Sequence, residues 1–214
     1  MFKWGRITSP LCPSYDHPQT LGHVVGGCFV HLKKGRYTYH HDSVLSNLAK
    51  SIPINERQTV YADIPGYCSP SIICGDDKRP DIVIVNDKTI ALIELSVGFE
   101  TNLSKNADAK QKRYERLLEE LKTSYLEINY INLSMGAIGT FGKSCSNLKT
   151  VLQKYGLCGS DLNYTLQKMA NVCIRTTYFI FCTRNKEWPK PDIWCGRNFV
   201  RTRRQPISRY YAYF

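Results

Sequence analysis

The sequence predicts an α/β fold of three layers, in which a central mixed β-sheet is flanked by helices. Two apolar runs rich in β-branched residues, at positions 80–86 and 89–96, flank a short polar turn as in a β-hairpin. Both faces of this hairpin are apolar, which is typical of strands in the middle of a covered sheet. A helical pattern at 102–122 and a further strand at 127–133 follow, in the order expected of a layered α/β core.

The other elements are expected before and after this block. A helix from about Asp42 to Ser51 and a strand at 59–62 precede the hairpin, and helices near 144–155 and 161–183 end the core. The chain is expected to divide into a Cys/His segment (1–33), a layered α/β domain (34–184) and a basic, aromatic tail (185–214).

Length and composition exclude several classes of protein. The chain has 214 residues with 43% hydrophobic content, enough to bury a sizeable core. It contains no apolar run of transmembrane length, and residues 1–6 lack the apolar stretch of a signal peptide. The nine cysteines are odd in number, and Cys145, Cys173 and Cys182 fall in apolar helical patterns. We therefore expect reduced thiols and an intracellular protein that does not contact a membrane.

The positive charge is concentrated at the C-terminal end. The net charge of the chain is +11, and residues 184–214 hold eight basic residues against two acids, a net charge of +6. Three tyrosines and Phe214 follow the last arginines. Basic residues beside aromatic ones suit a phosphate backbone with bases available for stacking, although a charged tail can also be only a solvated segment. The composition thus favours nucleic acid as a partner.

Two acids occupy the outer ends of the hairpin strands. If Asp87-Lys88 is the two-residue turn, Asp81 lies directly opposite Glu94. Cross-strand neighbours have Cβ atoms about 5 Å apart and point to the same face, so the two negative charges repel unless a positive group lies between them. A divalent metal would serve, and the alternative is that both acids merely end their strands in solvent.

A lysine on the following helix strengthens the metal hypothesis. Lys110 falls in the centre of the apolar stripe of this helix, whereas Lys105 and Lys112 fall outside it. A lysine directed at a core is costly unless it meets an anion, and Asp81 and Glu94 are the anions available there. The alternative is that Lys110 extends along the surface to reach solvent.

Two carboxylates and a lysine around a divalent ion can hydrolyse phosphodiester bonds. Carboxylates hold Mg²⁺ or Mn²⁺, the ion polarises the phosphate and activates a water, and the lysine orients that water or stabilises charge. In this interpretation Asp81, Glu94 and the carbonyl of Leu95 bind the ion, and Lys110 positions the water. Arg79 is expected to contact the backbone of the scissile strand.

The spacing resembles a known nuclease signature. Pro80-Asp81, twelve residues and then Glu94 is similar to the PD-(D/E)XK motif, and most similar to the restriction-enzyme-like endonuclease of site-specific non-LTR retrotransposons. The usual lysine position, two residues after the second acid, is Ser96; in the retrotransposon branch it moves to the next helix as Lys-x3-Tyr, which Lys110 and Tyr114 match. Further blocks that carry the resemblance are 36–45, 61–65 and 174–178.

The resemblance implies a function and partners. It implies an Mg²⁺- or Mn²⁺-dependent DNA endonuclease of nuclear location, derived from a polyprotein whose reverse transcriptase region is a candidate partner. Tyr114 would support the lysine or the phosphate. The expected DNA-contacting residues are Arg79, Lys168, Arg175, Arg201, Arg203 and Arg204. A catalytically inactive nucleic-acid-binding relic of the same fold is the competing function, and a protein-interaction scaffold would leave the basic tail unexplained.

The N-terminal segment resembles an altered zinc knuckle. His23-x4-Cys28 with Cys12 upstream is similar to the Cys-x2-Cys…His-x4-Cys knuckle that precedes this endonuclease in the retrotransposon polyproteins. The second cysteine position is occupied by Tyr15, and tyrosine is a poor zinc ligand. His17 could supply the fourth ligand from a shifted position. Zinc binding and a segment held by packing alone therefore both stay open.

Three further residues lie near the expected cleft. Asp42 at the expected helix start is interpreted as an N-cap. The resemblance also leaves Asp42 or His41 as candidates for binding the metal or the DNA. Asp63, at the end of a strand, is a candidate for the same role. None of the three matches a motif strongly enough to be assigned a catalytic role.

Overall fold

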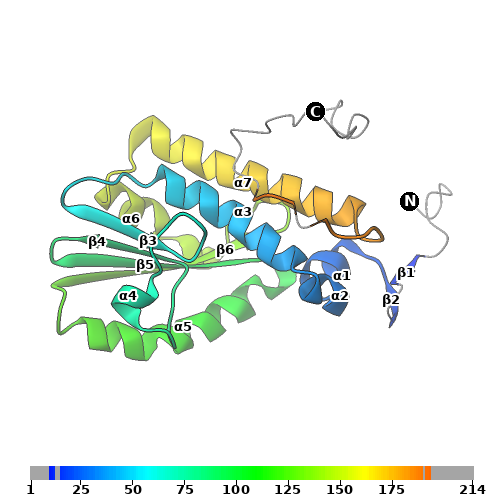
Figure 1. Ribbon diagram of the computed structural model, residues 1–214, viewed down its shortest axis with the longest axis horizontal. Helices are drawn as coiled ribbons and strands as arrows, with labels where there is room; N and C mark the ends of the chain where they lie inside the picture. Colours follow the sequence, from blue (N-terminus) through cyan, green and yellow to red (C-terminus); the bar gives the residue numbers. More distant parts are fainter. Residues whose placement is uncertain (1–9, 13–14, 190, 194–214) are drawn as a thin grey trace.

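The computed structural model describes residues 10–12, 15–189 and 191–193, and its core has three layers (Figure 1). Helices α3 (Arg36–Ser51), α6 (Leu148–Lys154) and α7 (Gly159–Cys182) cover one face of a four-stranded sheet. Helix α5 (Leu103–Leu121) covers the other face. The predicted three-layer α/β architecture is confirmed.

The sheet is mixed, with the strand order β3-β4-β5-β6. Its strands are β3 (Gln58–Ala62), β4 (Ile82–Asn86), β5 (Thr89–Gly98) and β6 (Glu127–Gly136). The first three strands pair antiparallel, whereas β5 and β6 pair parallel. A parallel pair needs a crossover connection, and α5 supplies it between β5 and β6.

The hairpin between β4 and β5 has the predicted register. Asn86 pairs with Thr89 and Ile82 pairs with Ile93, so Asp87 and Lys88 form the turn. Asp87 has a φ of 48°, in the left-handed region that aspartate enters more readily than most residues. The turn therefore fixes which residues of the two strands face each other.

Alternation along the strands produces a separate apolar core on each face of the sheet. The residues facing α3, α6 and α7 are Ile82, Ile84, Ala91, Ile93 and Leu95. The residues facing α5 are Val83, Ile90 and Leu92, with Val85 at the edge, and they meet Tyr114, Leu117 and Leu121. The same alternation directs the side chain of Glu94 toward α5.

The N-terminal segment consists of short elements beside the end of α7 (Figure 1). These elements are β1 (Leu11–Cys12), β2 (Tyr15–Pro18), α1 (Leu21–Gly26) and α2 (Phe29–Lys33). Val24 and Val25 of α1 pack with Ile180 of α7 and with Trp188. A Cβ at Gly22 would lie 3.1 Å from the ring of Phe99, so this small residue allows α1 to approach the core closely. The remaining short helices are α4 (Ser71–Cys74), η2 (Glu100–Asn102) and η3 (Lys143–Cys145).

The start of α3 differs from the expectation. The helix begins at Arg36, after Gly35 in the left-handed conformation with a φ of 71°, so Asp42 lies inside the helix and is not its N-cap. Arg36 is fully buried, and its guanidinium donates to the carbonyls of Thr183 (3.1 Å) and Lys186 (2.8 Å). Backbone acceptors from a distant segment thus allow a charged residue at a buried helix position.

Two smaller findings complete the comparison with the expected elements. Strand β6 continues to Gly136, beyond the predicted end at 133, because its parallel pairing with β5 runs on to Gly98. Within the described ranges, none of the helices is long and apolar enough to cross a membrane.

Candidate functional sites

Asp81 and Glu94 lie next to each other at one end of the hairpin. Asp81 immediately precedes β4, and Glu94 lies within β5, one position beyond the Ile82–Ile93 pair. The Leu95 amide donates to Asp81 Oδ2 at 2.6 Å, and the Asp81 amide donates to Glu94 Oε2 at 3.2 Å. Each carboxylate is therefore held by the backbone at or beside the other acid.

Lys110 extends from α5 to this acid pair. Its Nζ lies 2.7 Å from Glu94 Oε1 and donates to the carbonyl oxygen of Leu95 at 2.5 Å. Lys105 and Lys112 of the same helix are exposed. The helical stripe that places Lys110 inward also places these two lysines outward, as the sequence pattern predicts.

Tyr114 hydrogen-bonds to the second acid. It lies one helical turn after Lys110 and is fully buried, and its hydroxyl lies 2.9 Å from Glu94 Oε2 and 3.1 Å from the carbonyl oxygen of Arg79. The guanidinium of Arg79 lies 2.9 Å from Asp63 Oδ2, with both side chains well exposed. Tyr114 therefore holds Glu94 from the buried side, on α5, while the side chain of Arg79 lies at the solvent-exposed edge of the same site.

His41 of α3 joins the acid pair from the opposite helical layer. Its Nε2 lies 3.2 Å from Asp81 Oδ2, and its Nδ1 lies 2.9 Å from Asp42 Oδ1. Sequence patterns assign His41 no definite role because Asp81 is forty positions away and no local spacing connects them. The name "acid site" is used below for Asp81, Glu94, Lys110, Tyr114 and His41.

The charges of the acid site perturb one another. Burial and the negative charge of Asp81 raise the pKa of Glu94 against the opposing effect of Lys110. Burial would raise the pKa of Asp81, but the hydrogen bond and charge of His41 and the charge of Lys110 outweigh it and lower this pKa. Burial would lower the pKa of His41, yet its contacts with Asp42 and Asp81 raise it to about 10. The site thus combines shifted carboxylates with two cations.

The donor atoms of the acid site suit a hard divalent cation. Both acids and the carbonyl of Leu95 offer oxygen, which is what Mg²⁺ and Mn²⁺ prefer. Among the described residues, no hydrogen bond is donated to Asp81 Oδ1, because both contacts of this carboxylate fall on Oδ2. Oδ1 of Asp81 is therefore available to a cation without the loss of an existing hydrogen bond.

The residues expected to contact DNA are dispersed. Arg79 lies beside the acid site. Lys168 is half-buried and Arg175 is exposed on α7, which packs on the sheet face opposite α5. Arg201, Arg203 and Arg204 lie outside the described residues, so their role stays a prediction.

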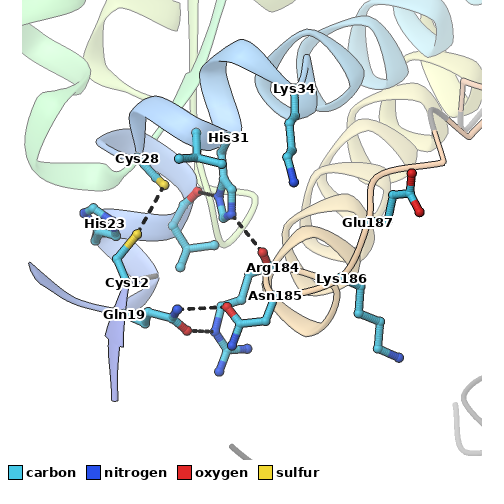
Figure 2. Close-up of a pocket in the computed structure, with 12 residues that line it drawn as sticks. Cys12, Gln19, His23, Cys28, His31, Lys34, Arg184, Asn185, Lys186 and Glu187 are labelled. Atoms are coloured by element: carbon cyan, nitrogen blue, oxygen red, sulfur yellow. Dashed lines mark hydrogen bonds between the residues drawn. The ribbon is translucent and has the colours of Figure 1, made fainter. Parts of the chain in front are cut away.

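A second group of ligand-type side chains forms in the N-terminal segment (Figure 2). Cys12 of β1, His23 of α1 and Cys28 at the start of α2 offer ligand atoms that all lie within 4.8 Å of one another. The two sulfurs are 4.0 Å apart and face each other in the close-up. These three residues are called the Cys/His cluster. His17 lies outside it, with its ring stacked on that of His23 at a centroid distance of 5.5 Å.

The Cys/His cluster borders a cavity of about 340 Å³. Figure 2 shows that its walls come from the N-terminal segment and from the chain just after α7. On the N-terminal side, Nδ1 of the buried His31 lies 2.8 Å from the carbonyl oxygen of Val24. Burial, followed by the charge of His17, lowers the pKa of His23, which favours the neutral imidazole that a metal binds.

Comparison with protein-family models and with curated proteins finds no match for this chain. Membership of the PD-(D/E)XK nucleases is therefore not shown, and the resemblance of the Pro80-Asp81 and Glu94 motif to them stays a prediction. The function is inferred below from the geometry of the acid site and the Cys/His cluster.

Proposed function

We propose that the protein is an endonuclease that hydrolyses phosphodiester bonds in DNA with Mg²⁺ or Mn²⁺. The observation that carries this proposal is the acid pair, Asp81 and Glu94, with Lys110 Nζ 2.7 Å from one carboxylate. A buried Glu94 and a partly buried Asp81 beside a lysine are costly to maintain, and metal-dependent phosphodiester hydrolysis is a chemistry that uses all three groups.

The two acids, Lys110 and Tyr114 have different roles in this proposal. Asp81, Glu94 and the Leu95 carbonyl hold the ion, which when bound polarises the phosphate and lowers the pKa of a bound water. Lys110 orients the attacking water or stabilises the charge that develops on the phosphate. Tyr114 keeps Glu94 in place through the 2.9 Å contact of its hydroxyl.

DNA is the substrate that the charge of the chain supports. The net charge of +11 favours a polyanion, and the exposed Arg79 stands at the edge of the acid site. The resemblance to retrotransposon endonucleases further suggests a nuclear location and the reverse transcriptase region of the parent element as a partner. An inactive DNA-binding relic is the competing function, and Tyr15 at the expected cysteine position favours it.

A plasmid-nicking assay separates these two functions. Supercoiled DNA should be nicked with Mg²⁺ or Mn²⁺ and stay intact with EDTA. Asp81→Asn and Glu94→Gln should abolish nicking, whereas Asp108→Asn should not, because Asp108 is an exposed acid on α5. Binding of DNA without cleavage in either metal would establish the relic and refute the nuclease.

We also propose that the Cys/His cluster binds Zn²⁺, with Cys12, His23 and Cys28 as ligands. The supporting observation is that their donor atoms lie within 4.8 Å of one another. Thiolate and imidazole are the ligands that zinc prefers, and three protein ligands can be completed by a fourth ligand such as water. Metal analysis of the purified protein should find one zinc per chain. Cys28→Ser should lose it, whereas Cys158→Ser should retain it, because Cys158 is exposed and outside the cluster.

A further inference from the structure

The acid site receives side chains from both helical layers of the fold. Lys110 and Tyr114 reach it from α5, whereas His41 reaches it from α3, which packs on the other face of the sheet. The α5 residues contact Glu94 and His41 contacts Asp81, which precedes the first residue of β4 and so lies beyond the paired part of that strand. His41 therefore links α3 to Asp81, one of the proposed metal ligands.

The contacts of the Asp81 carboxylate are unequal. Oδ2 accepts from the Leu95 amide at 2.6 Å and lies 3.2 Å from His41 Nε2. Oδ1 accepts no hydrogen bond from the part of the chain that the structure describes. The terminal torsion of an aspartate is broad, so one bond to Oδ2 leaves the plane of the carboxylate poorly defined, and a second donor from another direction restricts it.

His41 is itself held on its far side. Its Nδ1 lies 2.9 Å from Asp42 Oδ1, so the imidazole spans two carboxylates. This contact fixes the ring orientation, in the way that second-sphere carboxylates orient the histidines of metal sites. The resulting chain of contacts runs from Asp42 through His41 to Asp81.

We propose that His41 is a positioning residue: it holds Oδ2 of Asp81 so that Oδ1 is presented to the divalent cation. The proposal rests on the nuclease function proposed above, because it takes Asp81 as a metal ligand. Loss of an outer-sphere partner of this kind typically weakens metal binding by about 10- to 100-fold. A histidine that only tied α3 to the sheet would change stability and leave metal affinity unaltered.

Calorimetric titration of the zinc-loaded full chain with Mn²⁺, without DNA, tests the proposal. Mn²⁺ prefers oxygen ligands, so the Cys/His cluster should not compete for it. His41→Ala should raise the Kd for Mn²⁺ about 10-fold or more. His41→Gln should recover part of the affinity, because its amide can still donate to Oδ2. Lys112→Ala is the matched control, since it removes an exposed positive charge and should leave the Kd unchanged.

The outcomes separate this inference from the function on which it depends. If wild type binds Mn²⁺ and Asp81→Asn does not, the metal site stands, and an unchanged Kd in His41→Ala refutes the positioning role alone. Tighter binding in His41→Ala also refutes it, because His41 would then compete with the ion. If wild type binds no Mn²⁺, both proposals fail. If His41→Ala does not fold, Asp42→Asn and His41→Gln are titrated with Mn²⁺ in its place. A raised Kd for Mn²⁺ in both variants supports the positioning role, and an unchanged Kd in either variant refutes it.

Discussion

The acid site and the Cys/His cluster gather metal-ligand side chains in different ways. The acid site is built mainly on a ten-residue strand and a nineteen-residue helix, and α3 adds His41. Its charged groups pair with one another, as Lys110 does with Glu94 and His41 with Asp81. The cluster is built on a two-residue strand and helices of six and five residues. Its two sulfurs lie 4.0 Å apart without an ion pair between them.

This difference indicates how each site depends on its metal. Buried charges must be paired even when no ion is bound, so the hydrogen bonds of the acid site fix its geometry in advance. Thiols can lie together without a counter-charge, but helices of five and six residues are too short to be stable on their own. We therefore expect the acid site to keep its shape without a metal and the N-terminal segment to depend on one.

The largest expected effect is on catalysis at the acid site. Lys110→Ala should lower the rate of DNA cleavage by about 10²- to 10³-fold, the usual loss when a group that stabilises developing charge is removed. DNA affinity, measured with Ca²⁺ in place of Mg²⁺, should hardly change, because the lysine acts in the transition state. Lys112→Ala is the control. An active Lys110→Ala together with an inactive Lys112→Ala would overturn the assignment of the lysine.

The parts of the acid site that follow from local patterns could be predicted from the sequence. A two-residue turn fixes the hairpin register, so the relation of Asp81 to Glu94 follows from residues between them. The position of Lys110 follows from the helical spacing of the apolar residues around it. Both features depend on stretches of fewer than about 20 residues, where periodicity is informative.

The features that the sequence did not predict depend on distant partners. Arg36 can be buried at the start of α3 because its guanidinium donates to the carbonyls of Thr183 and Lys186. The residues near Arg36 in the sequence do not indicate these distant acceptors. His41 acquires its place in the acid site from Asp81 in the same way. The sequence favours an N-cap role for Asp42, which is wrong, because a cap is the simplest local role for that residue type.

The second effect tests whether the two sites are independent. Removing zinc with a selective chelator should cancel its stabilisation, about 2.7 kcal/mol for zinc at 100 times its Kd. For a chain of this size that change lowers Tm by about 5–10 °C. The affinity of the acid site for Mn²⁺ should not change. A parallel weakening of Mn²⁺ binding would show that the cluster supports the acid site and would end the distinction between them.

The third effect concerns DNA affinity outside both sites. The chain should be shortened after residue 193 and not after Arg184, because Trp188 packs with Tyr39 and Phe179 and must be kept. Residues 194–214 hold five arginines and no acid. If they bind phosphates, affinity should fall for all DNA sequences, and the slope of log K against log salt should flatten by about 0.9 for each phosphate that the shortened chain no longer neutralises. An unchanged slope would indicate that residues 194–214 do not contact phosphates and that the folded core binds the DNA.

The last expected effect is the pH dependence of stability that the adjacent histidines His40 and His41 impose. The folded chain keeps the His41 proton up to a pKa of about 10, whereas the unfolded chain releases it near 6.5. The stability due to His41 is therefore complete below pH 6.5 and is lost as the pH rises toward 10. Burial lowers the pKa of His40 to about 4, so that histidine favours unfolding as the pH falls from 6.5 to 4.

Urea unfolding midpoints between pH 5 and pH 9 measure both effects. His41→Ala should flatten the decline above pH 7. It should also make the decline below pH 6.5 shallower, because the charge of His41 adds to burial in lowering the pKa of His40. The alkaline decline should also shrink in Asp81→Asn, which removes one of the two charges that hold the His41 proton. If His41→Ala instead retains the full decline above pH 7, the ion pair between His41 and Asp81 contributes nothing to stability. The charged side chains of the acid site would then not hold its geometry in the absence of a metal.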